Sequence, residues 1–237
     1  MSFPQNVQPI GRKETFHFRC HPQVPCFNEC CRELELALTP YDVLRLRDSL
    51  NLTSAEFLAR HAVVEFTESH QFPLVYLGMV DDGKASCPFV TGEGCLVYID
   101  RPGACRTYPV GRGASMGQNR QVHEQFIILR EQHCLGSADA QKQNIEQWVE
   151  NQEITPYNRY NDLLMALTQH PKMKRGMRLS QEQADLFITA LYDPDSFRTS
   201  RLFLDQVSDN SAIDENYIDN TRILENAIEI LVKEFFR

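Results

Sequence analysis

The 237-residue chain contains no apolar run approaching the roughly 18 residues that a membrane-spanning helix needs. This absence predicts a soluble protein with no membrane span. The first residues also lack the apolar core and small-residue cleavage site of a secretory signal, so we expect a cytoplasmic, reducing location. In that environment cysteines serve as free thiols or metal ligands more often than as disulfides.

An excess of basic residues is lacking as well. The formal net charge is −8, and acidic residues outnumber basic ones both before residue 140 (16 against 13) and after it (16 against 11). A nucleic-acid-binding face requires clustered Lys and Arg side chains. The short basic cluster at residues 172–175 is typical of a solvated helix end. We therefore predict no nucleic-acid partner.

Cysteine is absent from the last 103 residues, although the chain has eight cysteines in all. Core packing explains one or two buried cysteines, but not a set of eight confined to one part of a chain. Four disulfides would suit an exported protein, which the missing signal argues against. We predict that these residues bind metal, with at least six of them in contact with it: Cys20, Cys26, Cys30, Cys31, Cys87, Cys95, Cys105 and Cys134.

The predicted ligands are all sulfur, and this narrows the choice of metal. Thiolates bind soft cations, either as four ligands around one zinc ion or as ligands to the irons of an iron–sulfur cluster. Side chains of neighbouring residues on an extended backbone point apart, so Cys30 and Cys31 are unsuited to one mononuclear site. We therefore predict an iron–sulfur cluster as the first choice, or zinc, with the pair divided between two metals or two irons.

The part of the chain that carries the cysteines shows short extended segments and two capped helices. Thr39 and Thr53 each begin a capping pattern, which predicts one helix from residue 40 to about residue 50 and a second from residue 54 through Val64. Residues 111–117 contain three glycines and are predicted to be a connector. Extended segments or strands are predicted at residues 16–19, 33–38, 73–80, 96–98 and 121–129, with a hairpin turn at residues 81–83.

Beyond residue 140 the pattern is helical throughout. Helix starts are predicted at Asn144, Thr155 and Ser180, and the last helix from about Ile213. Its apolar stripe serves core packing or a protein partner: Ile223, Leu224, Ala227, Ile228, Leu231 and Phe235. The predicted fold class is α+β, with a small irregular cysteine-rich metal-binding domain at residues 1–140 and an all-helical C-terminal region at residues 141–237.

Several local motifs together resemble one protein family. They are Cys26-x3-Cys30-Cys31, Leu38-Thr-Pro-Tyr-Asp42, Cys87-Pro-Phe89, Gly94-Cys95-x-Val-Tyr98 and Arg101-Pro-x-x-Cys105-Arg-x-Tyr-Pro109. Over residues 16–136 the chain resembles the YkgJ-type cysteine-cluster family of zinc- or iron-chelating proteins. It departs from the compact family pattern in the five residues between Cys20 and Cys26, and in Leu135, which replaces a proline.

This resemblance implies metal binding and leaves the reaction open. One relative, the flagellin lysine N-methylase, carries a similar module, so a metal-dependent enzyme that modifies a protein side chain is one alternative. A structural zinc module in an interaction protein is another. Nearby residues are expected to offset thiolate charge or exclude water, namely Arg19, Arg32, Arg101, Arg106, Tyr98 and Tyr108. Because few apolar residues order the loops, metal removal is expected to unfold residues 16–136 before the helical region.

Overall fold

The computed structural model describes the chain except for residues 1–3, 68–70, 118, 120 and 209–218. It combines short strands with helices and ends in a helical region, so the α+β class is confirmed. The chain forms two compact units, and each is made of two separate stretches. Unit 1 comprises Met1–Leu36 and Met79–Arg159, and unit 2 comprises Ala37–Gly78 and Tyr160–Arg237. The boundary at residue 140, between a cysteine-cluster domain and a helical C-terminal region, stays a prediction.

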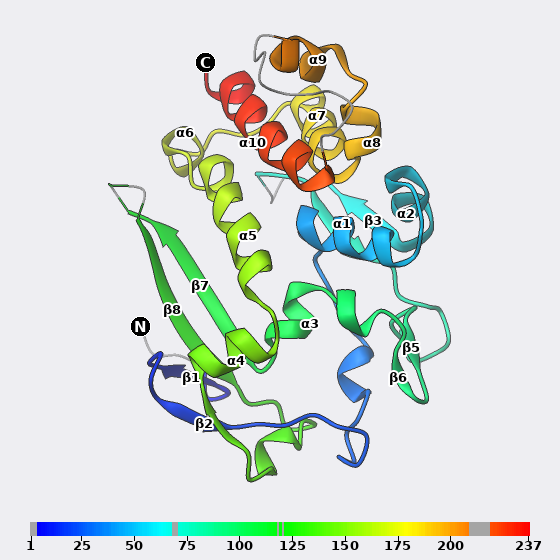
Figure 1. Cartoon of the computed structure of the whole chain (residues 1–237), viewed down its shortest axis with the longest axis vertical. Coiled ribbons are helices and arrows are strands. Elements are labelled where there is room, and N and C mark those ends of the chain that lie inside the picture. Colours follow the sequence, from blue (N-terminus) through cyan, green and yellow to red (C-terminus); the bar gives the residue numbers. More distant parts are fainter. Residues whose placement is uncertain (1–3, 68–70, 118, 120, 209–218) are drawn as a thin grey trace. The chain divides into compact units, whose positions relative to one another are not determined.

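Unit 1 contains a three-stranded antiparallel sheet in the order β1-β8-β7, with strands Val7–Ile10, Val122–Leu129 and Val110–Met116. Figure 1 shows β7 and β8 as the long hairpin of this unit. The prediction of a connector at residues 111–117 is wrong, because these residues form most of β7. Gly111 lies opposite Ile127, and a Cβ at Gly111 would be 2.7 Å from the Ile127 side chain. Here the glycine accommodates a cross-strand neighbour.

A hydrophobic core supports this sheet. Strand β2 (Thr15–His17) pairs antiparallel with β9 (Lys142–Asn144), which leads into helix α4 (Ile145–Asn151). A helix start is predicted at Asn144, and its side chain caps α4 by accepting a hydrogen bond from the Gln147 amide. The buried core residues are Phe16, Phe18, Val110, Phe126, Ile128, Ile145, Trp148 and Ile154. Cys134 packs against this cluster, so apolar contacts already order one of the cysteine segments.

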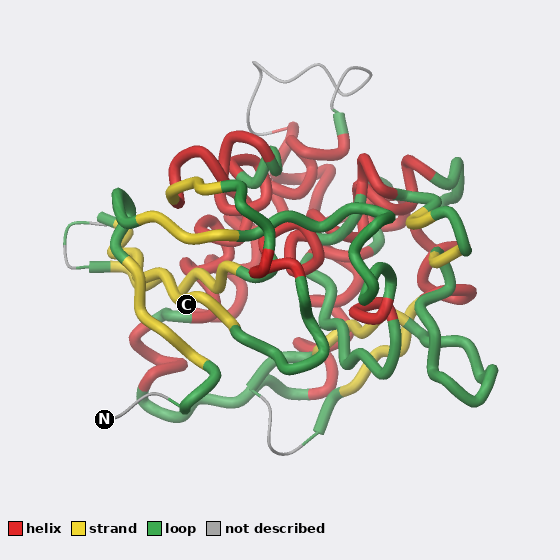
Figure 2. The backbone as a smooth tube through the Cα atoms, turned by 90° about the horizontal axis from the view of Figure 1, so that it is seen from below, coloured by secondary structure: helices red, strands yellow, loops and turns green. Residues whose placement is uncertain are grey.

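The other cysteine segments of unit 1 contain only short helices and strands. Figure 2 shows long stretches of loop between the helices and strands of the chain. Their elements are η1 (Glu29–Cys31), β5 (Val90–Thr91), β6 (Gly94–Cys95), η2 (Tyr98–Asp100), α3 (Gly103–Thr107) and η3 (Gly136–Ala138). Two strand predictions are wrong: residues 96–98 lead into η2, and residues 33–38 make only an isolated bridge at Ala37. Residues 33–38 nevertheless keep the alternation of buried and exposed side chains expected of a strand, since Leu36 and Leu38 are buried. The predicted turn after Val80 closes through one bridge, to Ser86.

Unit 2 is mainly helical and contains one two-stranded antiparallel ladder, β3 (Ala62–Glu65) with β4 (Leu74–Leu77). The predicted capping boxes are present at Thr39, Thr53 and Ser180. The second helix stops at His61, so the prediction that Val64 is helical is wrong. The helices are α1 (Pro40–Ser49), α2 (Ser54–His61), α5 (Thr155–Thr168, begun in unit 1), α6 (Pro171–Lys174), α7 (Gln181–Tyr192), α8 (Pro194–Phe197), α9 (Arg201–Ser208) and α10 (Asn220–Phe236).

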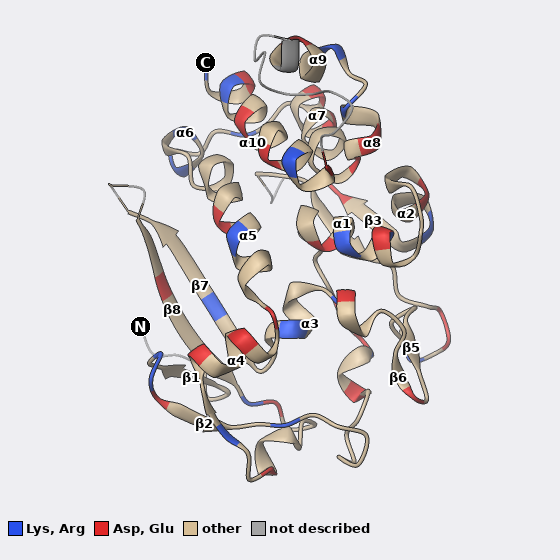
Figure 3. Cartoon of the chain, viewed as in Figure 1, with Lys and Arg blue, Asp and Glu red and all other residues tan. Residues whose placement is uncertain are grey.

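The last helix packs through the stripe predicted for it. All six stripe residues, from Ile223 to Phe235, are buried within unit 2. Asp219 caps the helix, and its start at Asn220 lies later in the chain than predicted; Ile213 is outside the described residues. No helix of the described chain is long and apolar enough to cross a membrane. Basic and acidic residues are interspersed along α10 and along the β7–β8 hairpin (Figure 3).

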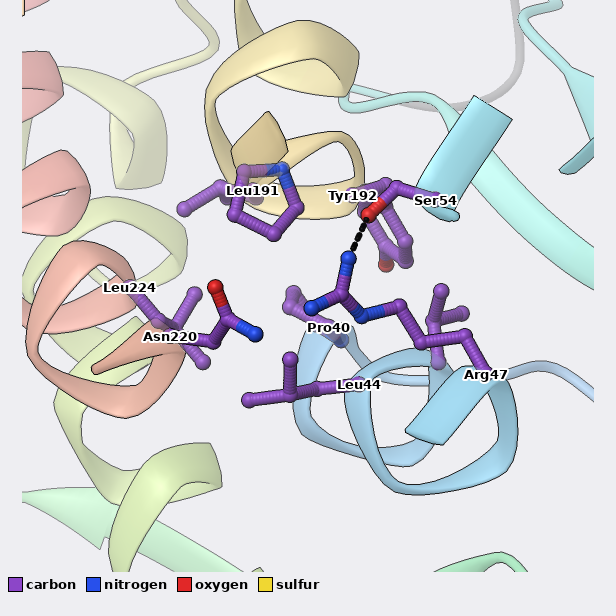
Figure 4. A pocket seen from close by; sticks show the side chains of 10 residues that line it. Pro40, Leu44, Arg47, Ser54, Leu191, Tyr192, Asn220 and Leu224 are labelled. Atoms are coloured by element: carbon purple, nitrogen blue, oxygen red, sulfur yellow. Dashed lines mark hydrogen bonds between the residues drawn. The ribbon is translucent and has the colours of Figure 1, made fainter. Parts of the chain in front are cut away.

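A buried arginine joins three helices of unit 2. Arg47 of α1 donates hydrogen bonds from Nη1 to the Ser54 hydroxyl (2.7 Å) and to the Asp195 carboxylate (2.5 Å). The Ser54 amide also donates to Asp195, at 2.8 Å. Figure 4 shows the Arg47–Ser54 hydrogen bond beside Leu191 and Tyr192. Since the Arg47 side chain is only 6% exposed, its charge depends on the carboxylate for compensation.

This ion pair predicts a pH-dependent stability. Burial alone would raise the pKa of Asp195, but the hydrogen bonds from Ser54 and Arg47 outweigh it and lower the pKa below its usual value. The stabilisation is therefore present above the unfolded-state pKa of about 3.9 and is lost as pH falls through the folded-state pKa. Asp195→Asn should cost about 1–2 kcal/mol at pH 7, since Asp195 is partly exposed, and much less at pH 3.

Urea unfolding at the two pH values, followed by circular dichroism, measures this difference. The matched control is Asp205→Asn, which removes a carboxylate that is 71% exposed and 3.6 Å from Arg201. That exposed pair should contribute little at either pH. Equal destabilisation by the two substitutions at pH 7 would contradict a special role for Asp195.

Candidate metal centre

All eight cysteines lie in unit 1, and none forms a disulfide. Backbone hydrogen bonds bring their segments together from distant parts of the sequence. The Arg19 amide donates to Gly136 O at 3.0 Å, which joins the segments of Cys20 and Cys134. The Cys87 amide donates to Cys31 O at 2.8 Å. The cysteine segments therefore meet in two places, one at each of these hydrogen bonds.

Gly136 allows the first of these approaches. A Cβ at this position would be 2.7 Å from the Phe18 ring and 3.0 Å from Arg19 O. Real side chains do not tolerate such distances without displacement of their neighbours. The Cys134-Leu-Gly136 segment thus needs its glycine so that the chain can pass close to Phe18 and Arg19.

Three thiols gather at the first meeting place, and we name them the Cys20 group: Cys20, Cys26 and Cys134. The pKa of Cys20 is raised to about 11, first by burial and then by the neighbouring thiols of Cys30, Cys26 and Cys134. The Leu135 amide donates to Cys26 Sγ at 3.1 Å, which connects the segment of Cys134 to that of Cys26. Crowded thiols that resist ionisation when free give up their protons when a metal cation compensates the charge.

Four thiols gather at the second meeting place, and we name them the Cys87 group: Cys31, Cys87, Cys95 and Cys105. The pKa of Cys31 is raised by its hydrogen bond with Cys30, by burial and by the thiols of Cys87 and Cys105. The pKa of Cys87 is raised by burial and, further, by the thiol of Cys95. Burial likewise raises the pKa of Cys95. Every member of the group therefore interacts with another member or with a shared neighbour.

Cys30 stands between the two groups. A hydrogen bond between its side chain and that of Cys31 lowers the pKa of Cys30 to about 7, which makes it the more acidic thiol of the pair. Its thiol interacts with Cys20 of one group and with Cys87 and Cys95 of the other. The 3-10 turn η1, which follows Asn28 in the left-handed backbone region, brings these two consecutive residues between the groups.

One backbone amide donates a hydrogen bond to a sulfur, and others lie near enough to favour a thiolate. Besides Leu135 on Cys26, the amides of Phe89 and Val90 favour the thiolate of Cys87, and the Val97 amide favours that of Cys95. Donors aimed at sulfur stabilise the ionised form that binds metal and tune the metal it holds. Sequence analysis missed these donors, because an amide acts here through its backbone position and not through its residue type.

Among the four arginines expected to offset thiolate charge, Arg101 fits best. It is buried, its guanidinium lies 4.0 Å from the centre of the Tyr98 ring, and its charge interacts with Cys95 and Cys105. Burial lowers the pKa of Arg101. Arg106 instead donates to the carbonyls of Gln152 and Ile99, and Arg32 pairs with Glu29 at 2.9 Å. Tyr98 is 55% exposed and so supports Arg101 more than it excludes water.

The chemistry of these residues fits a thiophilic metal, although the sulfurs of each group do not converge on a single point. Within the described residues, no three His, Cys, Asp or Glu side chains form a ready-made metal cage. What fits is the donor set: eight thiols that form no disulfide, amides near the sulfurs, and a buried cation beside Cys95 and Cys105. Metal binding requires the sulfurs of each group to move closer together.

Comparison with family models agrees with this chemistry. Residues 19–135 match the family CxxCxxCC, described as "Putative zinc- or iron-chelating domain". The matched residues make up just under half of the chain. The match includes all eight cysteines and confirms the resemblance to YkgJ-type proteins, so this part of the chain is similar to a zinc- or iron-chelating domain. Comparisons with curated proteins and with solved structures gave no match.

A groove of about 720 Å³ lies beside the Cys87 group in unit 1. Its walls come from residues 22–28, from the Val80–Ser86 turn and from the loop after Cys87. Cys87 is the one cysteine that lines it, and Phe27, Pro88 and Val90 supply apolar surface. The Asn28 side chain donates to Thr91 O at 3.0 Å and ties two of the walls together. A small molecule in the groove would lie next to the Cys87 group.

Proposed function

We propose that the eight cysteines hold two adjacent metal centres, as iron–sulfur clusters by first choice and as zinc ions otherwise, in a cytoplasmic protein. The Cys20 group with Cys30 supplies four thiolates, and the Cys87 group supplies four more. Eight thiolates suit two four-ligand centres, whereas a single tetrahedral ion needs only four. The observation that carries the proposal is the position of two consecutive residues, Cys30 and Cys31. The Cys31 thiol interacts with the Cys87 group, whereas the Cys30 thiol also interacts with Cys20.

The surroundings of the thiols support metal binding over core packing. Cysteines that serve as small apolar side chains need neither amide donors nor a buried arginine. Here amides favour the thiolates of Cys26, Cys87 and Cys95, and Arg101 interacts with Cys95 and Cys105. Such donors and cations offset the negative charge that four thiolates leave on a zinc ion or a cluster.

Anaerobic purification followed by an absorption spectrum and analysis of iron, zinc and acid-labile sulfide tests the proposal. We expect two centres per chain and at least six cysteines protected from alkylation until the metal is removed. A brown protein with iron and sulfide in equal amounts identifies clusters, and a colourless one with two zinc ions identifies zinc. One four-coordinate ion per chain, or three or more disulfides in a reduced preparation, would contradict the proposal.

An enzyme that modifies a protein side chain is the second candidate, and the groove at Cys87 favours it over a closed structural zinc module. Catalytic metal sites keep a coordination position open, whereas structural ones are closed by four protein ligands. Azide added to the cobalt-loaded protein should change the visible absorption spectrum of the metal only if a coordination position is open. A protein partner of the helical region must use residues outside the buried stripe of α10, such as Leu204, which is 40% exposed.

A further inference from the structure

The hydroxyl of Tyr108 is a buried polar group without a satisfactory partner. Tyr108 follows α3, and its ring packs edge-on against Phe18 with the ring centres 5.9 Å apart. The residue before it, Thr107, accepts a hydrogen bond at its carbonyl oxygen from Trp148 Nε1, at 2.8 Å. The Tyr108 hydroxyl is nevertheless buried and makes no hydrogen bond of good geometry. Such groups are rare in native proteins, and each one needs an explanation.

Two side chains lie beside this hydroxyl, Cys134 and Glu131. The Glu131 side chain is 41% exposed and its carboxylate lies 3.6 Å from His133 Nε2. The carboxylate can therefore interact with water and with His133. Cys134 is partly buried against the hydrophobic core and has fewer alternatives. Of the two side chains, the Cys134 thiol is therefore stabilised more by a hydrogen bond from the Tyr108 hydroxyl.

A thiol and a thiolate differ greatly as partners for a hydroxyl. A neutral S–H is a weak acceptor, whereas a thiolate accepts a charge-assisted hydrogen bond. A tyrosine hydroxyl carries a proton at neutral pH, and this one is buried without a hydrogen-bond partner, so it can act as a donor. The mismatch seen with free thiols is removed when Cys134 becomes a metal-bound thiolate.

We propose that Tyr108 is a positioning residue whose hydroxyl donates a hydrogen bond to Cys134 Sγ in the metal-bound protein. The proposal rests on the proposed function, because it requires Cys134 to ligate metal. The hydrogen bond orients Cys134 toward the Cys20 group and stabilises its thiolate. It also makes the fixed Tyr108–Phe18 contact part of the metal site, since the ring position determines where the hydroxyl points.

Tyr108→Phe in the full-length chain tests the proposal, because it removes the hydroxyl and keeps the ring. Loss of a hydrogen bond to a ligand typically weakens metal binding about 10- to 100-fold, and we expect that range for zinc in a chelator competition. In the cobalt-loaded protein, the sulfur-to-metal absorption band should shift. The variant should be as stable as wild type or more stable without metal, because an unsatisfied buried hydroxyl is gone, yet less stable with metal.

Tyr157→Phe is the matched control. Its hydroxyl is also buried in unit 1 but already has a protein partner, Arg106 Nη2 at 3.4 Å. It should change stability in the same direction with and without metal and leave metal affinity unchanged. If Tyr108→Phe likewise leaves metal affinity unchanged and shifts stability equally with and without metal, the proposal about Tyr108 is wrong. The proposed pair of metal centres could still be correct.

Glu131→Gln separates the two possible partners of the hydroxyl. If the hydroxyl serves Cys134, Tyr108→Phe should weaken zinc binding by the same factor in the Glu131→Gln background as in the wild-type background. If Glu131→Gln abolishes the effect of Tyr108→Phe, the hydroxyl serves the carboxylate and the proposal is wrong. A wild-type chain that binds no metal instead refutes the proposed function, so the two failures are distinguishable.

Discussion

Removal of the bound metal is expected to abolish amide protection at residues 20–33 and 85–106, while the β1-β8-β7 sheet stays protected. The η1 turn contains no buried residue, and Cys20, Cys30 and Cys105 are exposed, so little apolar burial orders these loops. Metal ligation then supplies their folding free energy, which for structural zinc reaches about 10 kcal/mol or more. The sheet instead rests on the core around Phe16, Phe126 and Trp148.

Hydrogen exchange with and without a chelator measures this effect, and unit 2 provides the internal control. Its helices bury their own apolar residues, such as Phe57, Leu191 and Leu231, and should keep their protection in both conditions. Sequence alone predicts that the whole of residues 16–136 unfolds. The hydrophobic core limits this expectation to the loops. Core residues inside the range 16–136 pack together without metal, among them Phe16, Phe18, Val110 and Phe126. Equal protection of the loops before and after chelation would contradict the metal's role in ordering them.

Replacement of Cys30 or Cys31 by serine is expected to remove about one of the two proposed centres in each case, and a different one. Loss of Cys30 should expose the Cys20 group to alkylation, because its thiol interacts with that of Cys20. Loss of Cys31 should expose the Cys87 group, because its thiol interacts with Cys87 and Cys105. Neither residue should replace the other, since their side chains serve different centres.

Metal analysis combined with alkylation and mass spectrometry identifies the freed thiols. Cys26→Ser and Cys105→Ser are matched controls, because each removes a thiol from one group without touching the consecutive pair. Cys26→Ser should reproduce the pattern of Cys30→Ser, and Cys105→Ser that of Cys31→Ser. Identical patterns for Cys30→Ser and Cys31→Ser, or no loss of metal in either variant, would show that the division is wrong. The thiol of Cys30 also interacts with Cys87 and Cys95, which makes this the decisive comparison.

Two adjacent centres would also account for the way the cysteine segments connect. Cys31 and Cys87 are joined by a backbone hydrogen bond, and Arg19 and Gly136 by another. Each bond brings together stretches that are far apart in the sequence, and a metal centre at each place would fasten them. Closure of long loops by a metal removes conformational freedom from the unfolded chain, so each centre would stabilise the connections around it.

The amino-acid sequence by itself determined the features that depend on a few consecutive residues. Thr39, Thr53 and Ser180 cap helices as predicted, because a cap needs only the side chain and the next three amides. The buried stripe of α10 follows from its helical period. The set of eight cysteines, and hence the metal-chelating character, is likewise readable from residue type and confinement alone.

Only the tertiary structure decided the features that depend on distant partners. Residues 111–117 look like a glycine-bearing connector and form a strand because β8 pairs with them, while residues 33–38 alternate like a strand but find only one bridge. The arrangement of the thiols has the same origin. Sequence spacing brings Cys20, Cys26, Cys30 and Cys31 together, whereas the fold places Cys134 beside Cys20 and Cys87 beside Cys31. These contacts join residues more than fifty positions apart, and no local pattern encodes them.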